Sequence, residues 1–156
     1  MTDNTTRDLV SRYVGVWGLG DAEERRKAIE TLWVESGTHV LQPPEELRTS
    51  AARLGFVAST LEATGYDELE ARVARTYEEF VAGGEYAFRP GEYAVRLKDV
   101  VRFDWEMVAT ASGEVVGGGQ EVLMVGADQR IVADYQVPNP CAGRPLSHRL
   151  GGRPPA

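Results

Sequence analysis

The hydrophobic pattern changes its period at Glu85, and this change constrains the fold more than any other feature of the sequence. Before Glu85, apolar side chains recur at every third or fourth residue, as on amphipathic helices; after it they alternate, as on half-buried strands. The alternation predicts strands over 85–90, 93–110, 113–125 and 130–137, with hairpin turns near 112–113 and 126–129. Helices that precede a run of strands in this way are typical of an α+β fold.

The first half of the chain predicts three helices, one short strand and a flap. The helices span 5–18, 21–33 and 66–82. Asp21 can cap the second helix, because Glu24 follows it by three places. The strand covers 37–42 and is stopped by two prolines, and 45–65 reads as a flap with a short helix near 47–54. Three helices on one face of a curved, mainly antiparallel sheet would leave a conical hollow.

Composition excludes several classes of function. The formal net charge of −7 and the pI near 4.9 argue against a nucleic-acid partner, which needs a clustered basic face. No run of about 18 apolar residues indicates a membrane span, and residues 1–10 lack a signal pattern. One cysteine, Cys141, and two histidines make a poor metal set. We therefore expect a cytoplasmic bacterial protein without a metal or cofactor, built as one domain over 1–137 with a disordered tail over 138–156.

One strand presents two chemically different faces. Its apolar face carries Val101, Phe103, Trp105 and Met107, and its polar face carries Arg102, Asp104 and Glu106. The partner strand has two possible registers. A two-residue turn places Gln120, Val122 and Met124 beside the apolar row, whereas a three-residue turn places Glu121, Leu123 and Val125 there.

Four segments together resemble the nuclear transport factor 2-like superfamily, specifically its SnoaL-like branch of proteins similar to polyketide cyclases and ketosteroid isomerases. They are RYVGVWGLGD (12–21), LWVESGTHVLQP (32–43), VRFDWEMV (101–108) and GGGQEVLMVGADQRI (117–131). The resemblance runs from about residue 7 to 137. It implies a cone-shaped sheet against three helices around a pocket, and a homodimer through the outer sheet face. It does not name a function, because this fold hosts isomerases, cyclases, epoxide hydrolases and non-catalytic binders.

The resemblance also implies roles for particular side chains. Glu121 takes the position of an inward acid in ketosteroid isomerases, and Tyr13 that of their oxyanion-donating tyrosine. The following hairpin then sets Asp134 roughly opposite Glu121, as a base or as a partner that shares one proton. The position of the family's base, at the end of the first strand, falls on Gln42. An amide cannot abstract a proton at useful rates, so a steroid-type proton shuttle at this corner is not expected.

The remaining pocket wall is expected to be apolar. The predicted substrate contacts are Trp17, Val40, Gln42, Phe103, Trp105 and Met107. His39 alternates with Val40 and Gln42, so we expect it on the opposite face, at the sheet surface or an interface. Gly117 to Gly119 lack the strand–turn–helix context of a phosphate loop. They predict instead a bend in the sheet or the close approach of a ligand or helix.

The sequence is compatible with two functions. The first is a SnoaL-like enzyme that cyclises, isomerises or opens the epoxide of a hydrophobic, oxygenated substrate such as a polyketide or terpenoid intermediate. Tyr13 and Glu121 would polarise the substrate oxygen, unless Tyr13 only packs in the core. The second is a non-catalytic module that binds a ligand or dimerises, which the amide at Gln42 favours.

Overall fold

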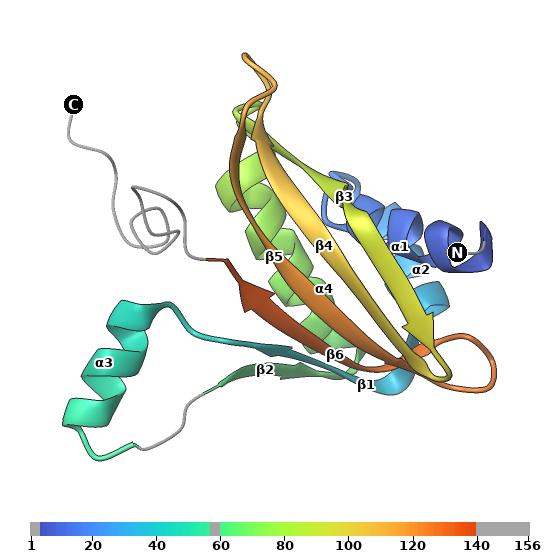
Figure 1. Ribbon diagram of the computed structural model, residues 1–156, viewed down its shortest axis with the longest axis horizontal. Coiled ribbons are helices and arrows are strands. Elements are labelled where there is room, and N and C mark those ends of the chain that lie inside the picture. The colour runs from blue at the N-terminus through green and yellow to red at the C-terminus, as the bar shows by residue number, and fades with distance from the viewer. Residues whose placement is uncertain (1–3, 57–59, 140–156) are drawn as a thin grey trace.

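The computed structural model describes residues 4–56 and 60–139 (Figure 1). The helices are α1 (Asn4–Val16), α2 (Ala22–Leu32), α3 (Glu45–Arg53) and α4 (Gly65–Thr76), which continues as a π-helical turn (Tyr77–Val81). The strands are β1 (Trp33–Leu41), β2 (Leu61–Thr64), β3 (Tyr86–Leu97), β4 (Val100–Ala109), β5 (Val115–Val125) and β6 (Ile131–Pro138). The predicted α+β class is confirmed.

The six strands form one sheet in the order β2-β1-β6-β5-β4-β3. Its neighbours are antiparallel except for β1 and β6, which run parallel, so the sheet is mainly antiparallel, as expected. Helices α1, α2 and α4 lie together on one side of it (Figure 1). Their apolar stripes and the inner face of the sheet bury one continuous core, and the concave space between these layers holds the pocket.

The predicted helical stripes are the faces that the three packed helices bury. Leu9 and Tyr13 of α1, Ile29 of α2, and Leu69 and Val73 of α4 are each at most 3% exposed. Burying such side chains contributes about 1.5–3 kcal/mol each relative to leaving them in water. The cap of α2 is also confirmed, since the Asp21 carboxylate accepts a hydrogen bond from the backbone N–H of Glu24.

The prediction of one continuous strand over 93–110 is wrong. Lys98 adopts a left-handed conformation with a φ of 52°, and the chain reverses there between β3 and β4. Conversely, the strand predicted over 85–90 and the first part of the strand predicted over 93–110 form a single strand. This strand, β3, runs from Tyr86 to Leu97, with an irregularity in its pairing between Pro90 and Ala94. A Lys-Asp pair is not among the common hairpin signals, which are rich in glycine and asparagine, so the alternation masked this turn.

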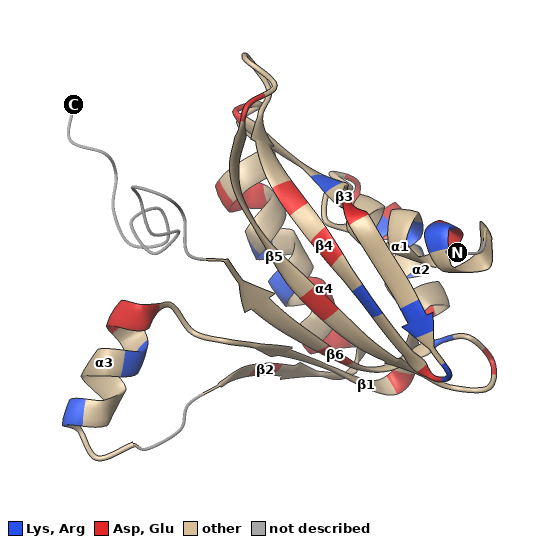
Figure 2. Cartoon of the chain, in the orientation of Figure 1, with Lys and Arg blue, Asp and Glu red and all other residues tan. Residues whose placement is uncertain are grey.

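A bulge in β5 decides which acid faces the core. Val116 is an extra residue of β5, inserted where its pairing with β4 changes register. Beyond this bulge Glu121 pairs with Phe103 and joins the apolar row of β4. Without the bulge Gln120 would take that place. The register that puts Glu121 inward is therefore confirmed, and the charged positions of β4, which are spaced along the strand in Figure 2, alternate with its apolar row.

The segment predicted as a flap leaves the body of the protein. Helix α3 buries none of its residues and stands away from the other helices (Figure 1). The chain returns through β2, which pairs antiparallel with the end of β1. No helix among the described residues is long and apolar enough to cross a membrane. The predicted tail lies mostly outside the described residues, but Pro138 ends β6 and belongs to the fold.

Candidate functional site

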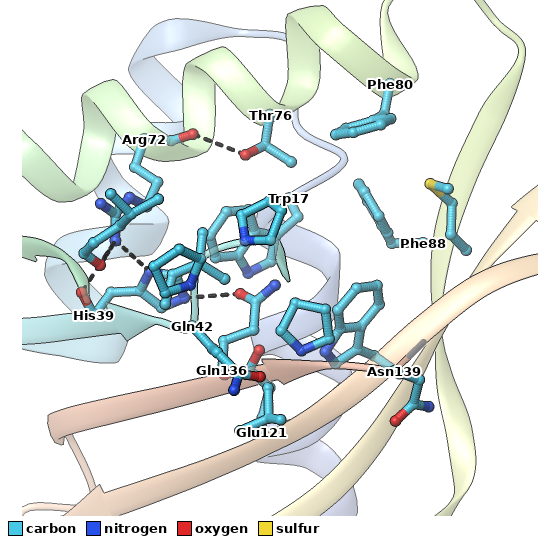
Figure 3. A pocket seen from close by; sticks show the side chains of 18 of the residues that line it. Trp17, His39, Gln42, Arg72, Thr76, Phe80, Phe88, Glu121, Gln136 and Asn139 are labelled. Carbon is cyan, nitrogen blue, oxygen red and sulfur yellow. Dashed lines mark hydrogen bonds between the residues drawn. The ribbon is translucent and has the colours of Figure 1, made fainter. Parts of the chain in front are cut away.

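A pocket of about 870 Å³ opens between the helices and the inner face of the sheet. Its wall has two chemically different parts. One part is aromatic and aliphatic, and its side chains include Trp17, Phe80, Phe88, Trp105 and Met107. The other part is polar and is built from Tyr13, His39, Arg72, Glu121 and Gln136 (Figure 3). Such a wall matches a ligand that is largely apolar and carries oxygen at one end.

The strand register brings the polar side chains together. Glu121 pairs with Gln136 on β6, and Asp134, two residues earlier, pairs with Leu123. Asp134 was expected roughly opposite Glu121, but it lies opposite Leu123, the next inward-facing residue of β5. The pairing of β5 with β6 shifts register near the turn that joins them, which contributes to this difference. The two carboxyls are still diagonal neighbours on one face. On the other side of β6, His39 pairs with Asp134.

Asp134 lies behind the pocket wall. Its side chain is fully buried and is not among the residues that line the pocket. The Tyr13 hydroxyl donates a hydrogen bond of 2.5 Å to Asp134 Oδ2. Burial, followed by the nearby carboxyls of Asp134 and Glu121, raises the pKa of Tyr13 well above its ordinary value, so the phenol keeps its proton. Tyr13 thus lines the pocket while its hydroxyl is already engaged.

Glu121 is the acid that the pocket reaches. Its side chain is 1% exposed and contributes to the wall. Burial, and then the charge of Asp134, raises the pKa of Glu121 well above its ordinary value; donor groups on Tyr13 and Trp105 act in the opposite direction. The pair therefore shares one proton, which Glu121 holds. Glu121 Oε2 is a buried oxygen at this wall and has no hydrogen-bond partner among the described residues.

His39 lies on the pocket side, and the prediction that it faces away is wrong. It is 1% exposed, lines the pocket and packs against the Trp17 ring at 5.4 Å between centroids. The prediction counted back from Gln42, but β1 ends at Leu41 and Gln42 no longer follows the alternation, whereas His39 and Leu41 keep it and both line the pocket. Burial lowers the pKa of His39; Asp134 opposes this and Arg72 reinforces it. His39 is accordingly neutral near pH 7.

His39, Glu121 and Asp134 place one ligand-type atom each within 4.8 Å of one another. This set does not fit a metal ion, because both ring nitrogens of its histidine are engaged in hydrogen bonds. Arg72 Nη1 lies 2.9 Å from His39 Nδ1, and His39 Nε2 lies 2.9 Å from Gln136 Oε1. Glu121 holds a proton as well, whereas a metal ligand must be deprotonated.

The apolar part of the wall is an aromatic row that the sequence indicated only in part. Phe80, Phe88 and Trp105 contact each other edge to face, at 6.1 and 5.8 Å between ring centroids. Phe80 comes from the π-helical turn, a feature often found at functional sites. Gly119 makes room for this row, since a Cβ there would lie 2.7 Å from the Trp105 ring. The group that comes close to Gly119 is thus the Trp105 side chain of strand β4, and not the ligand or helix that was predicted.

Four of the six predicted substrate contacts line the pocket and two do not. Trp17, Gln42, Trp105 and Met107 are on the wall. Phe103 is fully buried beneath it. Val40 pairs with Tyr135 and shares the outer face with it, while its neighbours His39 and Leu41 point inward. Gln42 faces the pocket because β1 ends at Leu41 and alternation stops there.

Several wall residues were not anticipated. They are His39, Arg72, Thr76, Phe80, Phe88, Gln136 and Asn139. The inward position of Phe88 follows from its pairing with Met107, because paired residues of neighbouring strands share a face and Met107 was predicted to line the pocket. Arg72 carried no such signal, since an arginine on an amphipathic helix is usually a solvated side chain.

Solved structures show what the fold resembles. A SnoaL-like family protein from Agrobacterium tumefaciens str. C58 is 18% identical, with a TM-score of 0.70 over 88% of this chain and 99% of that one. A SnoaL-like protein of unknown function from Burkholderia thailandensis E264 is 13% identical, with a TM-score of 0.58 over 89% and 98%.

An NTF2-like protein of unknown function from Exiguobacterium sp. 255-15 is 18% identical, with a TM-score of 0.56 over 84% and 98% of the two chains. No protein-family model and no curated protein matches the sequence. At these identities the likeness concerns the fold. The chain has the nuclear transport factor 2-like fold, in the form that SnoaL-like proteins share.

Proposed function

We propose that the pocket binds a hydrophobic, oxygenated small molecule of the polyketide or terpenoid type and acts on it by cofactor-free acid/base chemistry. The reaction would be a cyclisation, an isomerisation or an epoxide opening. One observation carries this proposal: the polar end of the pocket holds Glu121, a buried carboxyl whose pKa is raised and whose Oε2 has no hydrogen-bond partner among the described residues. A buried acid is costly unless it is used or paired.

The geometry suggests a division of labour among the three predicted catalytic residues. Glu121 would donate its proton to the ligand oxygen as negative charge develops there. Asp134 would not touch the ligand, because it lies behind the wall; its charge keeps the proton on Glu121. Tyr13 would hold Asp134 in place through its 2.5 Å hydrogen bond. Glu121 would regain its proton from the carbon or the water molecule that completes the reaction.

A thermal-shift screen tests this proposal. Bicyclic enones, terpenoid epoxides and polyketide-like phenols would be screened against the wild type and Glu121→Gln, which keeps the shape of the side chain and removes its acidity. We expect ligands that stabilise both proteins to be converted only by the wild type. Loss of the acid should lower kcat by about a hundredfold or more.

Glu114→Gln is the matched control, because Glu114 is exposed at the β4–β5 turn. It should bind and convert every ligand as the wild type does. Turnover by Glu121→Gln at the wild-type rate would contradict the proposed role of the acid.

A non-catalytic binding module is the second candidate. It is favoured by Gln42 at the position of the family's base and by the concealment of Asp134, which leave the polar end of the pocket with an acid but no evident base. The screen separates the two functions. A binding module gives ligands that stabilise the protein and are recovered unchanged from the wild type.

A further inference from the structure

The side-chain hydrogen bonds at His39 follow one donor-to-acceptor direction, from Arg72 through His39 to Gln136. Arg72 can only donate, since a guanidinium has no acceptor. Its Nη1 lies 2.9 Å from His39 Nδ1 and also donates to the backbone carbonyls of His39 and Leu61, at 3.1 and 2.9 Å. Nδ1 must therefore carry the lone pair. In a neutral imidazole the proton is then on Nε2.

The proton on Nε2 in turn fixes the hydrogen bond between His39 and Gln136. His39 Nε2, now a donor, lies 2.9 Å from the oxygen of the Gln136 amide. Because this oxygen is turned toward His39, the amide nitrogen of Gln136 is turned away from it. Gln136 lines the pocket next to its strand partner Glu121, and Figure 3 shows His39 and Gln136 joined along the wall. Among the described residues, no group accepts a hydrogen bond from this nitrogen.

We propose that Gln136 presents its amide N–H to the pocket as a second donor for a ligand oxygen, beside Glu121. Arg72 and His39 are positioning residues, because together they determine which end of the Gln136 amide faces the ligand. This inference deepens the proposed function and rests on it for the ligand. The orientation of the amide rests on the hydrogen bonds alone.

The charges around His39 keep this arrangement in place. Arg72 faces the ring from α4, and Asp134 faces it from β6, with 3.8 Å between His39 Nε2 and Asp134 Oδ2. Tyr13 of α1, Trp17 in the turn after α1, and Glu121 of β5 complete its surroundings in the pocket. Arg72 lowers the pKa of His39, after burial. Loss of Arg72 should therefore free Nδ1 to take the proton and make a charged His39 easier to form.

The tautomer of His39 tests the orientation without any ligand. Long-range ¹H–¹⁵N correlation spectra of the full chain distinguish the two ring nitrogens, and His148→Gln assigns the signals, because the chain has two histidines. We expect wild-type His39 to be protonated on Nε2. Arg72→Met should shift the population toward Nδ1–H and move the titration of His39 to higher pH.

Two variants separate this role from a general disturbance of the helix. Arg72→Lys retains a donor and a charge and should preserve the Nε2–H tautomer. Arg75→Met, also at the pocket wall on α4, should leave the spectrum unchanged. The Nδ1–H tautomer in the wild type, or an unchanged tautomer in folded Arg72→Met, would overturn the proposal. If Arg72→Met does not fold, the wild-type tautomer still decides.

A pair of ligands tests the donor itself. A bicyclic enone and the hydrocarbon of the same shape differ in the oxygen that Gln136 would meet. Gln136→Met should weaken enone binding by about five- to tenfold, the equivalent of one lost hydrogen bond, and leave hydrocarbon binding unchanged. Gln120→Met, the same change on the outer face of the neighbouring strand, should affect neither.

The outcomes for the two proposals differ. An unchanged enone affinity in Gln136→Met, or an equal loss for both ligands, would overturn the donor role of Gln136. If the enone does not bind the wild type at all, the proposed ligand class fails, while the His39 tautomer still decides how the Gln136 amide is oriented.

Discussion

At the polar end of the pocket, Tyr13 and Glu121 keep their protons beside the negative charge of Asp134. Asp134 accepts from Tyr13 and is fully buried, and Glu121 keeps its proton because it is desolvated next to that charge. A second charge there would be strongly disfavoured, since like charges at close range in a low dielectric cannot both ionise cheaply. Protonation at this site is therefore coupled both to folding and to any chemistry at the ligand oxygen.

The raised pKa of Glu121 predicts a pH dependence of stability. Above its ordinary pKa of 4.5 the unfolded chain releases this proton while the native state keeps it, so the unfolding free energy falls as pH rises. His39 has the opposite sign. Its lowered pKa costs stability only as pH falls below its ordinary 6.5. Above about pH 6.5, therefore, Glu121 contributes to the pH dependence of the unfolding free energy and His39 does not.

Glu121→Gln should remove this dependence. Relative to the wild type it should gain up to about 1.4 kcal/mol per pH unit, the linkage slope of one proton, until the native pKa of Glu121 is passed. Urea unfolding of both proteins at about pH 5 and about pH 8 measures the difference. Equal changes in the two proteins would mean that Glu121 is not the group that holds the proton.

Removal of the Tyr13 hydroxyl should destabilise the protein. Tyr13→Phe deprives buried Asp134 of its 2.5 Å hydrogen bond, and we expect a loss of about 1–3 kcal/mol in the free energy of unfolding. Tyr93→Phe is the matched control, because Tyr93 is 48% exposed, and it should change stability by less than about 0.5 kcal/mol. Similar stabilities of the two variants in urea unfolding would contradict the role given to this hydrogen bond.

At the scale of elements, the site depends on irregularities in the strands. The extra residue Val116 turns Glu121 inward, and the end of β1 at Leu41 lets Gln42 line the pocket together with His39. Gly119 lets the Trp105 ring lie across β5, close to Glu121. Each irregularity changes which side chains face the pocket, since one residue of slip exchanges the two faces of a strand.

Gly119→Ala should disturb the aromatic row. The new Cβ would lie 2.7 Å from the Trp105 ring and 2.8 Å from the Val137 carbonyl oxygen, so the ring must move. We expect a loss of about 1–3 kcal/mol in stability and weaker binding of any ligand found in the screen. Thermal unfolding and ligand titration measure the two effects.

Gly83→Ala is the control, because its Cβ would meet nothing within 4 Å. It should leave both stability and binding nearly unchanged. A Gly119→Ala protein as stable as Gly83→Ala would show that the Trp105 ring has room to move.

At the scale of the whole molecule, exposed apolar side chains lie beside the charged positions of β4 on the outer sheet face. One cross-strand row passes from Val95 through Arg102 and Val122 to Tyr135 and Val40. Val95 and Tyr135 are 40% and 44% exposed. Exposed apolar side chains grouped around one arginine on a sheet face are typical of a protein–protein contact surface. It supports the proposal, made from the family resemblance, that two copies of the chain pair through this face.

Tyr135→Glu should then convert a dimer into a monomer, because it places a negative charge between the apolar side chains of Val122 and Val40. Light scattering after size-exclusion chromatography measures the mass directly. Leu54→Glu, at an equally apolar but distant position that is 78% exposed at the end of α3, should leave the dimer intact. A monomeric wild type would exclude pairing at the concentrations used.

The sequence by itself determined the classes of the elements and the apolar row of β4, because these follow from periods of 3.6 and 2 that local sterics impose. The resemblance pointed to Glu121, Tyr13 and Asp134 as neighbours, and the structure brings them together. Only the tertiary structure decided their contacts. A bulge, a parallel strand pair and a turn at Lys98 set the registers, and these depend on packing between distant segments. For the same reason His39, Arg72 and Gln136, far apart in the chain, became one hydrogen-bonded wall that no local pattern indicates.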